Sequence, residues 1–441
     1  MKYSFDEKME RIGNHAAKWE ELDRNFGTPD LWPMWIADMD FKTAPEILEA
    51  LKKKVEYGIF GYVYRPDSYY QAAAEWSKKR FSYSVDAETL INSPGVVPSL
   101  SLLVRLFTKE KENILIQTPV YYPFAATIQA NNRRVIQNRL KKDEQGYYSI
   151  DFEDFEKQII DNKIRWFLLC SPHNPVGRVW KREELQKMAD ICVKYRVRVI
   201  ADEIWRDLVM PGNEHTPFAS LGRDIEDITI TCFSASKSFN LAGMQASFVC
   251  FPRREEKEIF DKELGILDIK RNSPFSLVAF ETAYRECDEW LDELREYINK
   301  NMDYAIQYMQ EKIPEIKVRK PEGTYLLWLD CSELALNKEQ LAEFLKEKAK
   351  LALDHGYWFG DHVDIFERMN VACPRFMLEE GLHRLERAIR EWRDNRKGGK
   401  YGKRKSGKKL WSHCFFTTFC FFGIIYWKWD DFYIFRSRGG F

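Results

Sequence analysis

Residues 228–243 have the sequence ITITCFSASKSFNLAG, in which a lysine follows a short apolar run. The run 228–233 predicts a buried strand, and Lys237 comes four residues after its end. Lysine is rarely buried without a partner. It is therefore either a solvated loop residue or a Schiff-base lysine beside an anion site that uses the hydroxyls of Ser234 and Ser236. Taken alone, the segment leaves both interpretations open.

The surrounding chain alternates strands and helices. Apolar runs at 166–170, 197–201 and 246–251 predict further buried strands, and 183–195 has helical periodicity. This alternation favours an α/β fold with a mostly parallel sheet and crossover helices. Ligands bind at the carboxyl ends of the strands in such sheets, so residues just after each strand are the candidates for a site.

Three polar residues come after three of these strands. Asn174 lies in the turn 171–177 (SPHNPVG), Asp202 comes after the run 197–201, and Lys237 after 228–233. Upstream, Gly95 in the segment 93–98 (SPGVVP) precedes a helical pattern and exposes free N–H groups to an anion. Each signal alone also fits an ordinary turn or helix cap. Together they supply an imine lysine, a pyridinium partner, a ring-oxygen donor and a phosphate cradle, which pyridoxal phosphate (PLP) requires.

Composition limits the class of protein. The 441 residues contain 68 Lys+Arg and 68 Asp+Glu, which argues against a generally basic nucleic-acid binder. Nine cysteines without a CxxC pair favour reduced thiols, and the charged first 18 residues do not resemble a signal peptide. We therefore expect a cytoplasmic protein with no disulfide framework and no metal site.

The last part of the chain differs from the rest. Residues 396–441 contain 11 basic and 2 acidic residues, a net charge of +9, so the other 395 carry 57 basic and 66 acidic residues, a net of −9. Residues 411–427 contain no charged side chain over 17 positions, the lower limit for a membrane span. Because four Ser, His and Thr residues interrupt this run, we favour an extension outside the fold over a membrane tether.

Four parts are expected along the chain. Residues 1–48 form an arm that joins the second domain, 49–285 a large domain, 286–395 a smaller C-terminal α/β domain, and 396–441 the tail. Within the smaller domain we expect a strand at 318–329 and helices at 339–349 and 379–395, preceded by a long helix at 276–311.

Several segments resemble a known family. They are 33–41 (PMWIADMDF), 171–180 (SPHNPVGRVW), 201–204 (ADEI), 234–243 (SASKSFNLAG) and 368–375 (RMNVACPR). They are similar to the fold-type I, PLP-dependent aminotransferase superfamily and, within it, to the MalY/PatB branch of cystathionine β-lyases. The resemblance covers about residues 1–395 and implies a large PLP-binding domain and a smaller C-terminal domain.

The resemblance also implies roles for individual residues. Lys237 forms the Schiff base with PLP, Asp202 pairs with the pyridine nitrogen, and Asn174 donates to the ring oxygen. Tyr121 stacks on the ring, although its neighbour Tyr122 is an alternative. The phosphate is bound by the backbone of Gly95, Val96 and Val97 and by the hydroxyls of Ser234 and Ser236. Tyr62 reaches the phosphate of a neighbouring subunit, which implies a homodimer. Arg375, assisted by the backbone of Ala37, binds the substrate carboxylate.

One position departs from the family pattern. Trp205 stands where aminotransferases of this superfamily often have tyrosine and this branch often has histidine. An indole N–H can donate a hydrogen bond but cannot accept one. The contact to the ring oxygen would therefore depend more heavily on Asn174.

The implied activity is cleavage of L-cystathionine or other cysteine S-conjugates to a thiol, pyruvate and ammonia. Lys237 removes the Cα proton, and a thiolate leaves from Cβ. An aminotransferase would use the same residues and remains the main alternative. A regulatory protein of this fold is less favoured, because the lysine is intact and we find no helix-turn-helix pattern.

Overall fold

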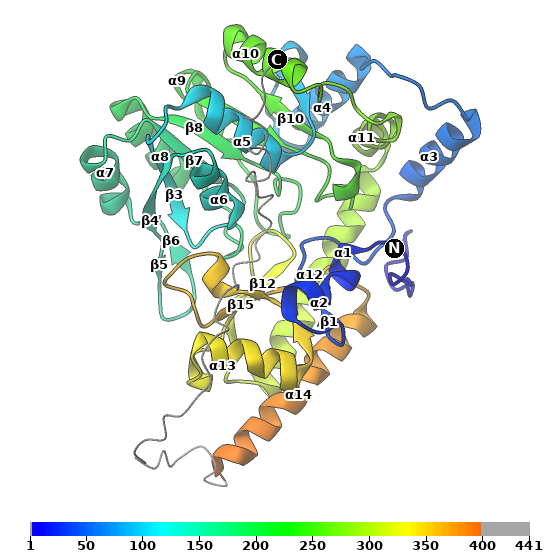
Figure 1. The fold of residues 1–441 in the computed structure, drawn as a ribbon, viewed down its shortest axis with the longest axis vertical. Coiled ribbons are helices and arrows are strands. Elements are labelled where there is room, and N and C mark those ends of the chain that lie inside the picture. Colours follow the sequence, from blue (N-terminus) through cyan, green and yellow to red (C-terminus); the bar gives the residue numbers. More distant parts are fainter. Residues whose placement is uncertain (1, 398–441) are drawn as a thin grey trace, which may run out of the picture.

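The computed structural model describes residues 2–397. The predictions made for the basic stretch after residue 397 and for the aromatic run 411–427 lie outside the described residues. Figure 1 shows the larger sheet in the upper part of the molecule and the smaller sheet below it, with α14 (Arg375–Lys397) at the lower end.

A seven-stranded sheet forms the core of the upper part, in the order β2-β10-β9-β8-β7-β3-β4. All of its neighbouring pairs are parallel except those made by β10, which is antiparallel to β2 and β9. The strands are β2 (Leu90–Ser93), β3 (Asn113–Thr118), β4 (Arg134–Arg139), β7 (Trp166–Cys170), β8 (Arg198–Asp202), β9 (Thr229–Phe233) and β10 (Ser247–Cys250). The expected mostly parallel α/β sheet is confirmed.

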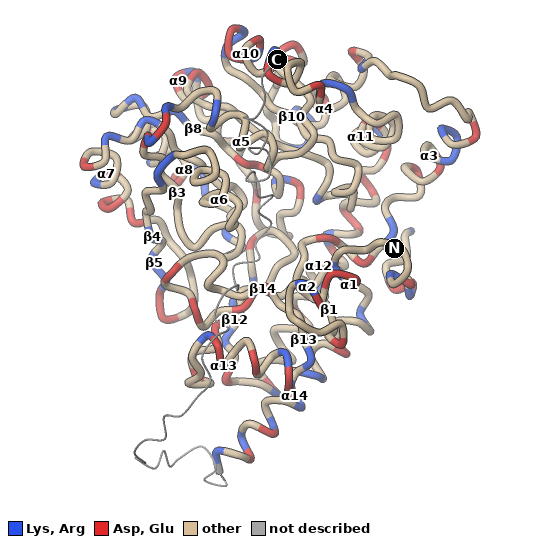
Figure 2. Tube along the Cα trace, viewed as in Figure 1, with Lys and Arg blue, Asp and Glu red and all other residues tan. Residues whose placement is uncertain are grey.

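Helices cover both faces of this sheet. In β7, Trp166 and Leu168 contact one apolar cluster while Phe167 and Leu169 contact another, as the two-residue period of a strand requires. The first face is covered by α5 (Val96–Phe107), α6 (Pro123–Ala130) and α10 (Arg254–Ile266). The second face is covered by α7 (Phe152–Asp161), α8 (Arg182–Tyr195), α4 (Asp67–Phe81) and α11 (Pro274–Glu286). Figure 2 shows charge along outer helices such as α7 and α10, whereas the sheet strands are mostly uncharged.

The lower part contains a four-stranded antiparallel sheet in the order β11-β12-β15-β14. Its strands are β11 (Lys317–Val318), β12 (Leu326–Asp330), β14 (Asp354–His355) and β15 (Phe366–Asn370). The helices α12 (Asp288–Lys312), α13 (Lys338–Glu343) and α14 pack beside it, and a π-helical turn at Phe344–Ala349 continues α13. The remaining helices and strands are α1 (Ala17–Glu20), α2 (Leu22–Phe26), α3 (Pro45–Tyr57), α9 (Arg223–Glu226), β1 (Trp32–Pro33), β5 (Lys141–Lys142), β6 (Tyr148–Ser149) and β13 (Leu351–Ala352). The parallel pair β1–β13 attaches the N-terminal arm to this part.

Three expected elements differ from those observed. The helix expected at 276–311 is two helices, α11 and α12, that meet at the buried Cys287. The strand expected at 318–329 is interrupted between β11 and β12 by a loop that contains Pro321 and Gly323, because proline and glycine disfavour a regular strand. The last helix begins at Arg375 instead of residue 379, so Arg375 belongs to a helix N-terminus.

No helix within residues 2–397 combines the length and the apolar character that a membrane crossing needs. In the same range, every cysteine is free.

Gly177 ends the turn that carries Asn174, and we predict that Gly177→Ala destabilises the fold. Its φ is +69°, and an added Cβ would lie 2.3 Å from Pro321 Cβ. The left-handed conformation costs an alanine about 1–2 kcal/mol, and the clash adds to this. We expect the free energy of unfolding to fall by about 3 kcal/mol in a urea titration. Gly212→Ala is the matched control, because φ there is +89° with nothing within 4 Å, and it should cost only about 1 kcal/mol. Equal losses for the two variants would contradict the proposed clash.

Candidate active site

A pocket opens at the carboxyl ends of β7, β8 and β9. The register pairs Cys170 with Asp202 and Asp202 with Cys232, so the three strands end at nearly the same level. The strand ends and their loops bring together three of the predicted residues, Asn174, Asp202 and Lys237. Other predicted residues in the pocket wall are Ala37, Gly95, Val96, Val97, Tyr121 and Ser236.

Lys237 lies in the loop after β9, with its amine inside the pocket wall. Its Nζ donates a hydrogen bond to the carbonyl of Ala37 at 2.7 Å and lies 5.7 Å from the ring centroid of Trp205. Burial lowers the pKa of the Lys237 amine to about 8, although the nearby charge of Asp38 opposes the shift. A larger fraction of the amine is therefore a neutral nucleophile at physiological pH than in an exposed lysine.

Asp202 is the last residue of β8 and is buried. One of its carboxylate oxygens accepts a hydrogen bond from the backbone N–H of Ile204 at 3.0 Å. Burial raises the pKa of Asp202 to about 7, and the charge of Glu203 adds to the shift. A buried carboxylate of this kind is stabilised by a bound cationic group, such as a protonated ring nitrogen.

Asn174 is oriented by an arginine that the sequence motifs did not single out. Arg368 in β15 donates from its guanidinium to Asn174 Oδ1 at 2.9 Å. Because a guanidinium can only donate, this contact assigns the amide oxygen to Arg368 and leaves the amide N–H groups as donors. Arg368 also pairs with the buried Asp354, and both side chains line the pocket.

The start of α5 forms one end of the pocket. Gly95 precedes the helix with a φ of +157°, close to extended backbone, and Val96 begins it. The unpaired N–H groups of the first turn and the helix dipole favour an anion at this end. Ser236 lines the same pocket, whereas Ser234 does not: its hydroxyl donates to the Ala246 carbonyl at 2.8 Å and accepts from the Ser236 N–H at 3.0 Å. The structure therefore places Ser234 as a support of the loop.

Aromatic side chains form the remaining walls. Tyr121 and Tyr122 both line the pocket, with ring centroids 5.3 Å apart, so the alternative between them stays open. Trp205 also lines the pocket and packs edge-on against Tyr325, with the two ring centroids 4.8 Å apart. Tyr62 lies outside this pocket and is 93 % exposed.

The structure does not bring Arg375 into the pocket, contrary to the sequence-based expectation. Its guanidinium donates to Asn301 Oδ1 at 2.9 Å and to the Lys300 carbonyl at 3.0 Å, and it lies over the ring of Tyr304. The physical reason is that the segment 368–375 leaves β15 after Asn370 and enters α14 at Arg375. Arg368, at the other end of the same motif, is the arginine in the pocket. Its position within a strand-like segment was the available signal, because an arginine buried in a strand needs partners.

Comparison with known proteins is consistent with this geometry. The family model for aminotransferases of class I and II matches residues 34–385. The chain is 39 % identical to cystathionine β-lyase PatB of Bacillus subtilis over 88 % of this chain and all of PatB. A PLP-bound protein of Clostridium difficile, provisionally described as an aminotransferase, superposes with a TM-score of 0.86 at 46 % identity and covers 88 % of this chain and 100 % of its own. Cystalysin of Treponema denticola, which contains PLP, has a TM-score of 0.85 at 38 % identity and covers 89 % and 100 %.

The burial of Asp202 predicts a pH-dependent gain in stability for Asp202→Asn. The folded protein holds the Asp202 proton up to about pH 7, whereas an unfolded aspartate loses it near 3.8. Stability contributed by Asp202 therefore falls as the pH rises between these values. The free energy of unfolding of Asp202→Asn, relative to that of wild type, should rise by about 2–3 kcal/mol between pH 5 and pH 8. Each pH unit up to 7 contributes ~1.4 kcal/mol to this difference.

Urea titrations of the ligand-free protein at both pH values measure this difference. Asp161→Asn, at an exposed position, is the control and should show no such growth. A variant that is equally stabilised or destabilised at both pH values would contradict the assignment of Asp202 as a buried, poorly solvated carboxyl.

Proposed function

The chain belongs to the family of class I and II aminotransferases, in the MalY- and PatB-type branch of cystathionine β-lyases, and from this we propose that it is a PLP-dependent carbon–sulfur lyase. Its substrates would be L-cystathionine or other cysteine S-conjugates, and its products a thiol, pyruvate and ammonia. The observation that carries the proposal is the meeting of Lys237, Asp202 and the Asn174–Arg368 pair in one buried pocket.

The donor set of the pocket fits PLP. Lys237 offers an amine of lowered pKa, Asp202 a buried carboxyl group, and Asn174 an amide N–H donor. The start of α5 with Ser236 offers donors to a phosphate. When bound, PLP supplies an aldehyde that condenses with amines and a ring that accepts the electron pair released when a Cα–H bond is broken.

Each residue would then have a distinct task. The free Lys237 amine accepts the proton from the substrate Cα, because its lowered pKa keeps a neutral fraction available. Asp202 holds a proton on the ring nitrogen. Arg368 binds the substrate carboxylate in place of Arg375, since a guanidinium fork matches a carboxylate and Arg368 lines the pocket. The carboxylate of Asp354 neutralises Arg368 until the substrate arrives.

An aminotransferase is the second candidate, and the similarity to the Clostridium difficile protein favours it. The two activities share the pocket and differ in the step after the Cα proton is lost. A lyase expels the group at Cβ, whereas an aminotransferase returns the proton elsewhere and needs a keto acid as second substrate. The branch similarity to PatB supports the lyase.

We also propose a homodimer. The connection between α3 and α4 exposes four large apolar or aromatic residues within six positions, Ile59, Phe60, Tyr62 and Tyr64. Such a patch is typical of an interaction surface. The Arg271 guanidinium lies 4.8 Å from the ring centroid of Tyr62. The edge of the patch therefore presents a cation beside the Tyr62 hydroxyl. In the dimer, Tyr62 of one copy would reach the pocket of the other copy, at the end formed by the start of α5, where the phosphate would bind.

The products distinguish the two activities. Purified protein supplied with PLP should release pyruvate from cystathionine and from S-methylcysteine without any added keto acid, measured with lactate dehydrogenase. Lys237→Ala should lower kcat by at least about a thousandfold, because the Cα base is lost. Amino-group transfer to a keto acid without pyruvate release would instead support the aminotransferase. If neither pyruvate nor a transamination product forms, both proposed activities are contradicted.

Matched substitutions distinguish the two arginines. Arg368→Lys keeps the charge beside Asp354 but loses the bidentate fork, so kcat/KM should fall by about thirtyfold or more, equivalent to ~2 kcal/mol of transition-state binding. Arg375→Lys should leave kcat/KM within about threefold, because the Arg375 guanidinium contacts Asn301, Lys300 and Tyr304, which lie outside the pocket. The reverse ranking of the two variants would restore Arg375 as the carboxylate ligand.

A further inference from the structure

The arm segment 36–41 (IADMDF) borders the pocket through Ile36 and Ala37 and is held by side-chain amides on two sides. Asn370 of β15 donates to the carbonyls of Ile36 and Asp38 at 2.7 and 2.6 Å. Asn240, three residues after Lys237, accepts from the Met39 N–H at 3.0 Å and donates to the carbonyls of Met39 and Phe41. The Ala37 carbonyl is left facing the pocket, where it accepts from Lys237 at 2.7 Å and from the Tyr325 hydroxyl at 2.8 Å.

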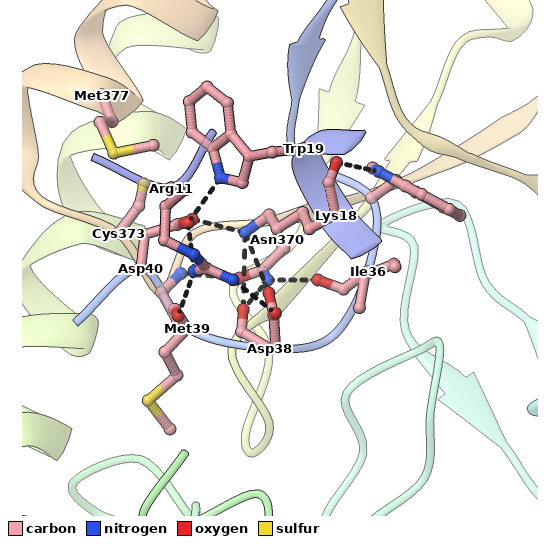
Figure 3. A network of polar contacts seen from close by, with 12 residues as sticks. Arg11, Lys18, Trp19, Ile36, Asp38, Met39, Asp40, Asn370, Cys373 and Met377 are labelled. Carbon is pink, nitrogen blue, oxygen red and sulfur yellow. Dashed lines mark hydrogen bonds and ion pairs between the residues drawn. The ribbon is translucent and has the colours of Figure 1, made fainter. Parts of the chain in front are cut away.

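The same segment is anchored by a cluster of four charged side chains, of which Lys18 and Asp40 are buried and Arg11 and Asp38 partly exposed, as Figure 3 shows them. Lys18 Nζ lies 2.6 Å from Asp40 Oδ2 and 3.6 Å from Asp38 Oδ1. Arg11 lies 2.7 Å from Asp40 and 3.0 Å from Asp38. The indole N–H of Trp19 completes the set with a 3.0 Å bond to Asp40. We call Arg11, Lys18, Asp38 and Asp40 the arm cluster.

Stability alone does not explain the arm cluster. The Lys18 side chain is 1 % exposed, and the cost of removing two charges from water often equals or exceeds their attraction. Burial lowers the pKa of Lys18, but Asp40 and Asp38 together raise it above its ordinary value, so Lys18 is charged. A buried pair of this kind specifies one arrangement of the chain, because any other would leave a charge unpaired.

The arrangement it specifies reaches Lys237. Asp38 and Asp40 are two residues apart and both face the arm cations, whereas Ala37 turns its carbonyl to the pocket. A shift of the segment that broke these ion pairs would therefore move the carbonyl that holds the Lys237 amine. The charged groups that act on this amine are Asp38, Asp202, Asp354 and Arg368.

We propose that Lys18 and Arg11 are positioning residues that act through Asp38 and Asp40. They hold the Ala37 carbonyl where it keeps the free amine of Lys237 oriented for transfer of the Cα proton. The catalytic part rests on the proposed function, whereas the effect of the arm cluster on Lys237 itself does not depend on any reaction.

The test compares Lys18→Met and Arg11→Gln with the control Lys42→Gln. Lys42 belongs to the same arm and pairs with Glu7 at 2.5 Å, but its side chain is 49 % exposed. Arg11 is 20 % exposed, and its loss leaves Lys18 paired with Asp40, so Arg11→Gln remains informative if Lys18→Met does not fold.

Two measurements are made on each full-length variant. In the holoenzyme, kcat should fall about tenfold or more in both test variants, because the Lys237 amine is misplaced. In the chain freed of cofactor, the rate of Lys237 acetylation by acetic anhydride is measured against pH by peptide mass spectrometry. Its midpoint should fall by about half a pH unit or more, because the ammonium loses the Ala37 acceptor and the ordered Asp38 charge. The control should change neither.

The labelling also separates positioning from a direct electrostatic effect. If the segment stayed in place, removing a cation near Lys237 would raise the midpoint, so a rise would overturn the proposal. An unchanged midpoint, or a kcat within about twofold of wild type, would overturn it as well. Absence of both lyase and transaminase turnover would contradict the proposed function, while the labelling would still decide whether the arm cluster positions Lys237.

Discussion

The site depends on one geometric constraint, the shared edge at which β7, β8 and β9 end. Parallel pairing in register places Cys170, Asp202 and Cys232 side by side, so the loops after these strands start from one level. Residues 63 positions apart, from Asn174 to Lys237, thereby line one pocket. The apolar clusters on both faces of the sheet hold this edge rigid, which a multi-residue site requires.

Burial at that edge favours the uncharged form of two groups, the Lys237 amine and the Asp202 carboxyl. The same exclusion of water lowers the pKa of the Lys237 amine to about 8 and raises the pKa of the Asp202 carboxyl to about 7. The pocket therefore holds a nucleophilic amine together with a poorly solvated carboxyl group. Both conditions oppose stability of the ligand-free protein and favour a ligand that carries an electrophilic carbon and a protonated nitrogen.

Closure of the pocket comes from the smaller sheet and the arm. Arg368 of β15 contacts Asn174 from the large sheet, and the Ala37 carbonyl of the arm contacts Lys237. The pocket is thus complete only when three distant parts of the chain are folded together. The buried ion pair between Lys18 and Asp40 holds the arm segment in one position, because a shift of the segment would leave a buried charge unpaired.

The order of residues alone was enough to predict the strand-and-loop pattern and three of the residues at the strand ends. Their signal is local, because an apolar run with a polar residue after it specifies a strand and its loop within a few positions. The same local logic failed between Arg368 and Arg375, two arginines of one motif, since only the path of β15 into α14 decides which one enters the pocket. It also missed Asp354 and the pairing of Lys18 and Arg11 with Asp38 and Asp40. These contacts join residues 14 to 29 positions apart across different elements. Whether such a charge is solvated or buried depends on packing that only the tertiary structure supplies.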